Sequence, residues 1–82
     1  MLDHENKVYV SVIVENNTAG QLRPLMIIWE DGRKFAVTRV REVRRAVSMK
    51  AGGMGIRYTV DVGRVTTNLW HEEDRWFVER RV

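Results

Sequence analysis

IRYTVDVGRVTTNLWH, residues 56–71, has the pattern of a β-hairpin. Its first half alternates apolar and polar residues, which is the period of a half-buried strand. Gly63 and Arg64 then form a two-residue turn with glycine first, the order that a type II′ turn favours. The expected cross-strand pairs are Val62–Val65, Tyr58–Leu69, Ile56–His71 and Arg57–Trp70.

A further strand follows this hairpin. The residues EEDR form the next turn, and WFVERRV continues as the last strand. This arrangement places Phe77 beside Trp70 on the outer face, next to Arg57. Two interpretations stay open. Either the two rings and the arginine form a platform on which unpaired bases stack, or a second layer of strands covers the rings.

Residues 40–48, which precede the hairpin, also admit two interpretations. Val40, Val43 and Val47 are spaced as on one face of a short helix. However, β-branched residues dominate, and a strand with a bulge near Arg41–Glu42 explains the same spacing. We favour the bulged strand.

The glycine-rich segment KAGGMG, Lys50 to Gly55, is expected to be the loop between that strand and the hairpin. It lacks the Gly-Lys-Ser/Thr ending of a Walker phosphate loop. Closing the loop between Met49 and Ile56 places Arg44 opposite Asp61, as an exposed pair of opposite charge. Arg45 then lies on the inner face, where an arginine is expected to reach solvent at the barrel rim.

The N-terminal part supplies the remaining strands. KVYVSVIVE, residues 7–15, alternates with its valines on one face, and LMIIWE, residues 25–30, follows a turn. Asp31-Gly32 is a signal for a type I′ hairpin turn, after which KFAVTRV returns as the partner strand. This turn places Ile28 opposite Phe35.

The whole pattern indicates an all-β fold. Six or seven short strands, with turns about every eight to twelve residues, predict a small antiparallel, partly open barrel of about six strands, SH3-like or OB-like in character. The 82 residues correspond to a single small β domain, residues 1–82, in which we expect residues 1–6 to be flexible.

The charge is unevenly distributed. The net charge is +3, but residues 33–64 contain nine bases and two acids, and both flanking parts are mildly acidic. Arginine, which makes forked contacts to phosphate, outnumbers lysine eleven to three. We therefore expect a binding module for nucleic acid, single-stranded DNA or RNA, or for another polyanion. The candidate nucleic-acid-binding residues are Arg39, Arg41, Arg44, Arg45, Lys50, Arg57, Arg64, Trp70 and Phe77.

Other classes of function find little support. The sequence has no catalytic motif, and His71 with the acids that follow it is interpreted as a solvated turn rather than a metal site, so we expect no enzyme, cofactor or metal. There is no cysteine, no signal-peptide pattern and no apolar run long enough to cross a bilayer, which fits a cytoplasmic location without a membrane partner. The alternative function is a protein-interaction or homo-oligomerisation module, with a homodimer or another protein as partner, acting through exposed strand edges.

Several segments together resemble a family of short uncharacterised proteins found in anaerobic Gram-positive bacteria. They are VYV near the start, WEDGRKF, RVREVRRA, KAGGMGIRYT and EDRWFVER, which cover most of the chain from Val8 onward. The resemblance implies a self-standing small protein, and it carries no assigned activity, substrate or cofactor.

Overall fold

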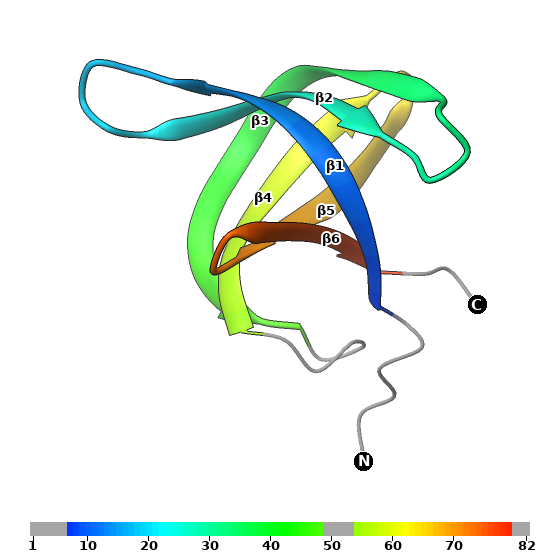
Figure 1. Ribbon diagram of the computed structural model, residues 1–82. Helices are drawn as coiled ribbons and strands as arrows, with labels where there is room; N and C mark the ends of the chain where they lie inside the picture. Colours follow the sequence, from blue (N-terminus) through cyan, green and yellow to red (C-terminus); the bar gives the residue numbers. More distant parts are fainter. Residues whose placement is uncertain (1–6, 49–53, 80–82) are drawn as a thin grey trace.

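The computed structural model describes residues 7–48 and 54–79, which form six antiparallel strands and no helix. The strands are β1 (Lys7–Asn16), β2 (Leu22–Ile28), β3 (Lys34–Val47), β4 (Met54–Val62), β5 (Val65–Glu72) and β6 (Arg75–Glu79). They close into a barrel in the order β1-β2-β3-β4-β5-β6, as Figure 1 shows. The predicted all-β class and small antiparallel barrel are confirmed.

Two expectations lie outside the described residues, namely the flexibility of residues 1–6 and the contribution of Lys50. Within the described ranges, no helix has the length and apolarity needed to span a membrane.

The barrel closes because β1 and β3 are each shared between two neighbours. The first part of β1, Lys7 to Val10, pairs with β6, and its second part, Ser11 to Asn16, pairs with β2. Similarly, β3 pairs with β2 through residues 34–36 and with β4 from Val37 onward. The far ends of β1 and β2 consequently project from the barrel as a two-stranded arm (Figure 1).

The β4–β5 and β5–β6 hairpins have the register that the sequence predicts. Val62 lies opposite Val65 and Arg57 opposite Trp70, and the following hairpin places Trp70 opposite Phe77. Gly63 has a φ of 60°, the positive value that the first position of a type II′ turn requires.

The β2–β3 hairpin differs from its expected register by one residue. Ile27, rather than Ile28, lies opposite Phe35. The cause is the turn: a type I′ turn needs positive φ at both central residues, and of Asp31 and Gly32 only Gly32 has it, at 90°. Since a slip of one residue exchanges the two faces of a strand, Phe35 shares its face with buried Ile27.

Residues 40–47 are strand, as we favoured, and bulges interrupt the β3–β4 pairing on each side of Val40. The second bulge lies between Val40 and Glu42, where one was expected. The register beyond the bulges was wrong by four residues, because Gly55 belongs to β4 and not to the loop. Arg44 therefore lies opposite Arg57 and not opposite Asp61.

The barrel interior holds the main core. Its buried members are Ile27, Tyr58, Val60, Leu69 and Trp76. Half-buried residues from five of the strands, all except β5, pack around them, namely Val10, Val12, Leu22, Val37, Val40, Ile56, Val62 and Val78. A second buried cluster, Trp70 and Phe77 with Ala46 packed against them, lies on the opposite face of the sheet. The outer face of this small barrel is therefore partly core.

Candidate nucleic-acid interface

One row of cross-strand neighbours runs along the outer face of the barrel. Arg44 of β3 lies opposite Arg57 of β4, which lies opposite Trp70 of β5; Phe77 of β6 and Tyr9 of β1 follow. The rings of Trp70 and Phe77 are almost parallel, at 4° and 5.8 Å between centroids, and Tyr9 meets Phe77 edge-on at 6.1 Å. We call this set the outer row.

The outer row changes from buried to exposed along its length. Trp70 is 3% exposed and Phe77 is 0% exposed, whereas Arg44 is exposed and Arg57 is half-buried. A base needs an open ring face to stack on, so Trp70 and Phe77 do not form the platform that we considered. They are structural residues, as the alternative interpretation held, and we remove them from the candidate interface.

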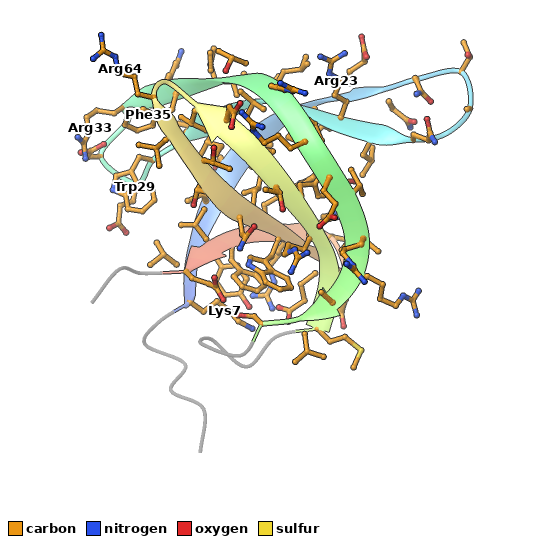
Figure 2. The ribbon with its side chains drawn as sticks, turned by 180° about the vertical axis from the view of Figure 1, so that it is seen from behind. Lys7, Arg23, Trp29, Arg33, Phe35 and Arg64 are labelled. Carbon is orange, nitrogen blue, oxygen red and sulfur yellow. The ribbon has the colours of Figure 1, made fainter. Side chains whose placement is uncertain are left out.

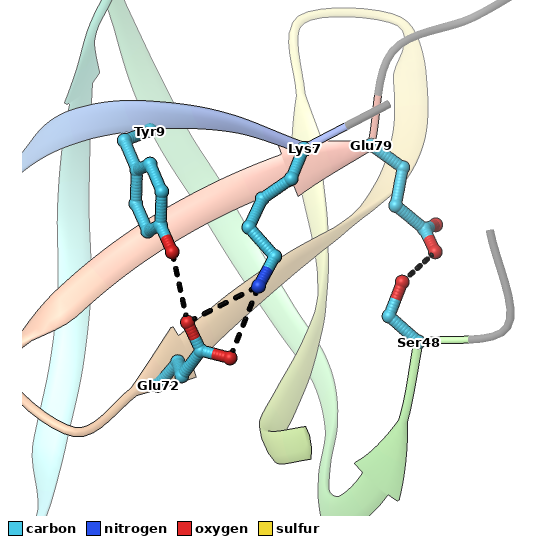
Figure 3. Close-up of polar contacts among 5 residues, drawn as sticks. All are labelled: Lys7, Tyr9, Ser48, Glu72 and Glu79. Atoms are coloured by element: carbon cyan, nitrogen blue, oxygen red, sulfur yellow. Dashed lines mark hydrogen bonds and ion pairs between the residues drawn. The ribbon is translucent and has the colours of Figure 1, made fainter. Parts of the chain in front are cut away.

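Three polar contacts, drawn in Figure 3, tie β1 and Ser48, the residue after β3, to β5 and β6. The Lys7 ammonium lies 3.1 Å from Glu72 Oε2, and the Tyr9 hydroxyl donates to Glu72 Oε1 at 3.0 Å. On the other side, the Ser48 hydroxyl donates to Glu79 Oε2 at 2.5 Å. β1 and the end of β3 lie far from Trp70 and Phe77 in the sequence, so no local pattern around the two rings identifies what covers them.

Glu72 is ionised and structural in this arrangement. Burial tends to raise the pKa of its carboxyl group, but the hydrogen bonds from Lys7 and Tyr9 and the positive charges nearby outweigh that effect and lower the pKa. Its neighbour His71 stacks on Trp76 at 4.4 Å. Among the described residues, no group of histidines and acids has the arrangement of a metal site.

Two candidate arginines are held in ion pairs. Arg41 Nε lies 2.7 Å from Asp61, and Arg57 Nη2 lies 2.7 Å from Glu42. Hydrogen bonds from Arg41 and Thr66 lower the pKa of Asp61. Both ion pairs are partly exposed, and ion pairs of this kind contribute little to stability. An anion that binds more strongly can therefore displace Asp61 or Glu42 from these arginines.

Four candidate arginines, Arg39, Arg44, Arg45 and Arg64, are exposed and have no ion pair within the described part of the chain. Arg39 and Arg44 lie on β3, and Arg64 lies in the β4–β5 turn. Arg45 lies opposite Ile56 and beside His71, at one end of the β3–β4 ribbon. It reaches solvent at the edge of the barrel, which is the placement that we expected for an arginine on the inner face.

The outer row also contains two buried donors without an acceptor. The Nε atom of Arg57 and the Nε1 atom of Trp70 are buried and make no hydrogen bond in the structure. They belong to neighbouring positions on β4 and β5. Unsatisfied buried donors are rare, so this part of the outer row favours an additional acceptor, such as a water molecule.

Sequence reasoning missed a second aromatic site, at the mouth of the barrel beside the β2–β3 hairpin. A hollow of about 420 Å³ opens there, with Trp29 and Phe35 in its wall. The Arg33 guanidinium lies 5.6 Å from the Phe35 ring centroid. In Figure 2 these three residues and Arg64 gather at one end of the molecule. The signal in the sequence was that Trp29 and Phe35 flank a glycine turn. However, the predicted register was wrong by one residue and placed Phe35 opposite Ile28 instead of Ile27.

Comparison of the chain with protein-family models, with curated proteins and with solved structures found no match.

Proposed function

We propose that this protein is a non-catalytic module that binds nucleic acid or another polyanion through the outer face of the β3–β4 ribbon. The observation that carries the proposal is the pairing of Arg44 with Arg57, two cations directly opposite each other on neighbouring strands. Like charges in this position destabilise a sheet. Glu42 offsets part of this repulsion through its 2.7 Å contact with Arg57, and an anion bound beside Arg44 offsets the rest.

The charges around this pair support the proposal. Glu42 neutralises Arg57, and Asp61 neutralises Arg41, which leaves Arg44 and Arg39 as exposed cations on the same strand. Arginine offers a planar fork of donors that matches phosphate. A chain of phosphates along β3 meets these guanidinium groups in turn.

The test is a titration of labelled single-stranded DNA, single-stranded RNA and a polyphosphate at several salt concentrations. Each phosphate contact to a single strand contributes about 0.7 to the slope of log affinity against log salt. The double variant R39A/R44A is therefore expected to bind more weakly and to lose about 1.4 from that slope. The matched control is Arg75→Ala, which removes an exposed cation of β6 that lies over Tyr9, away from the ribbon.

Three results would count against the proposal. They are the absence of any binding at low salt, an unchanged salt slope in R39A/R44A, and an equal loss in the control variant. Any one of them removes the β3–β4 ribbon as a polyanion site.

A second candidate function, self-association or binding of another protein, is favoured by the projecting arm. β2 pairs with β3 only from Met26 to Ile28, so its residues 22–25 have no strand partner on that side among the described residues. Ile13 and Leu25 on the arm are 46% and 40% exposed. Light scattering at two protein concentrations tests self-association. A mass that rises with concentration, and that Leu25→Lys returns to the monomer value, supports it; a constant monomer mass contradicts it.

The proposal includes a cytoplasmic location and a bacterial source of the kind that the sequence resemblance implies. Fractionation of cells that produce the protein tests the location. Recovery with the membrane or in the culture medium would contradict it.

A further inference from the structure

The mouth of the barrel beside the β2–β3 hairpin is an apolar hollow that the proposed polyanion site does not use. Its floor consists of interior side chains from four strands, namely Ile27, Val62, Val65, Thr67 and Val78. Trp29 and Phe35 form its aromatic wall. Mouths of β-barrels are a common place for small ligands, and about 420 Å³ lies within the usual range for such pockets.

The lining restricts what the hollow can hold. Val65 is 45% exposed at its edge, and the described floor offers one hydroxyl, that of Thr67. A phosphate would lose its hydration there without gaining enough donors, so the part of a ligand that enters the hollow is uncharged and presents an apolar or aromatic face to it. A ring that enters the hollow meets the indole of Trp29 and the phenyl ring of Phe35.

The charges at the rim indicate a ring that is attached to an anionic backbone. Arg33 and Asp31 neutralise each other through a 2.6 Å contact, and the carboxylate of Glu79 accepts a hydrogen bond from the neutral Ser48 hydroxyl and keeps its charge. Arg64, at the same end of the molecule (Figure 2), is exposed and has no ion pair within the described residues.

The β4–β5 turn brings one further cation close to the hollow. Arg64 of this turn directly precedes Val65, which lines the hollow. The exposed acid Glu30 lines a different hollow, along β1.

We infer that this hollow, the base pocket, holds an unpaired nucleobase while Arg64 contacts an adjoining phosphate. The inference rests on the proposed function and makes it more specific, because only a single strand can insert a base. Duplex DNA and inorganic polyphosphate can use the β3–β4 ribbon but not the base pocket. Stacking between aromatic rings, with Arg33 over one of them, supplies the additional affinity.

Tryptophan fluorescence reports directly on the base pocket. Trp70 and Trp76 are 3% and 8% exposed, whereas Trp29 is only half-buried and lies in the pocket wall. A short oligothymidylate is expected to quench the emission, and to bind about tenfold more tightly than a duplex or a polyphosphate with the same number of phosphates. The Trp29→Ala and Phe35→Ala variants are expected to remove that preference, while their affinity for polyphosphate stays at the wild-type value.

The conservative variant Trp29→Phe keeps an aromatic wall and is expected to retain most of the preference for the oligothymidylate. Near-ultraviolet circular dichroism of the remaining tryptophans detects a fold defect in Trp29→Ala. If there is such a defect, Trp29→Phe still tests the base pocket. If Trp29→Phe and Trp29→Ala bind the oligothymidylate as the wild type does, the base pocket is refuted while the β3–β4 site stands. If neither polyphosphate nor oligothymidylate binds at all, both the proposed function and this inference are refuted.

Discussion

Replacement of Gly55 by alanine gives the sharpest test of the β4–β5 geometry, because general expectation and structure predict opposite signs. In a strand, exchange of glycine for alanine ordinarily stabilises a protein by about 0.5–1 kcal/mol, since alanine restricts the unfolded chain and suits the extended backbone. In this barrel, a Cβ atom on Gly55 would overlap with the carbonyl oxygen of His71, much closer than van der Waals contact allows, with the Cα of Glu72 3.3 Å away. Both are backbone atoms and cannot rotate aside.

The clash must be relieved by a shift of β5 away from β4, next to the pairing of Ile56 with His71. Insertion of one methyl group into a closely packed site costs about 1–3 kcal/mol. For a domain of this size, 1 kcal/mol corresponds to about 4–8 °C in Tm. We therefore expect Gly55→Ala to lower the free energy of unfolding by about 1–3 kcal/mol and Tm by at least about 4 °C.

Urea unfolding followed by tryptophan fluorescence measures the change, and Ala36→Gly, at an exposed position of β3, is the control for a simple glycine effect. The control is expected to lose about 0.5–1 kcal/mol. A Gly55→Ala variant as stable as the wild type, or more stable, would show that β4 and β5 do not approach each other as described.

Three further predictions concern the two cores. Phe77→Ala should destabilise the fold by about 3–5 kcal/mol in urea unfolding, because the side chain is fully buried; a loss below about 1 kcal/mol would mean that the outer cluster is solvated. Because the folded-state pKa of Glu72 lies below its ordinary 4.5, its contact with Lys7 stabilises the protein above pH 4.5 and is lost as pH falls through the folded-state pKa. When the free energy of unfolding is measured at several pH values, Glu72→Gln should accordingly be less stable than the wild type at neutral pH and equally stable in acid. A difference in stability that does not change with pH would contradict the contact. Tyr58→Phe removes a 3.2 Å hydrogen bond to the Leu22 carbonyl and should cost about 0.5–1.5 kcal/mol, checked by thermal unfolding, with no change as the contrary result.

Local patterns were sufficient to predict the strands and the two C-terminal hairpins. The Gly63 turn and the short turn before Arg75 each span only a few residues, so they determine the registers of the two hairpins. Trp70 is therefore placed correctly beside Arg57 and Phe77. Turn length and alternation carry all the information that these pairings need.

Registers that depend on long or bulged segments were wrong. Gly55 was assigned to the loop because glycine usually marks one, yet it lies in β4 since only a residue without a side chain fits against His71. In the same way, Asp31 and Gly32 gave a turn signal without revealing which of the two takes the positive φ. In both cases tertiary contacts or backbone geometry decided what local propensity left open.

The candidate site was predicted only in part. The exposure of Arg39, Arg44 and Arg64 follows from their strand and turn positions and could be read from the sequence. The burial of Trp70 and Phe77 was one of two interpretations that the sequence left open, because it depends on β1 and the end of β3, which come from distant parts of the chain.

The meeting of β1 with β6 also sets the order in which the chain can fold. Lys7 is opposite Glu79, so the strands that seal the barrel are separated by almost the whole described sequence, and the entropy of closing that loop opposes the step. Hairpins such as β4–β5 need only neighbouring residues and form without it. On the ribosome, a nascent chain that has not yet released β6 has its Trp70 ring uncovered and β1 unpaired on that edge. Until β6 pairs, the apolar ring of Trp70 and the open edge of β1 are therefore available for contacts with other chains.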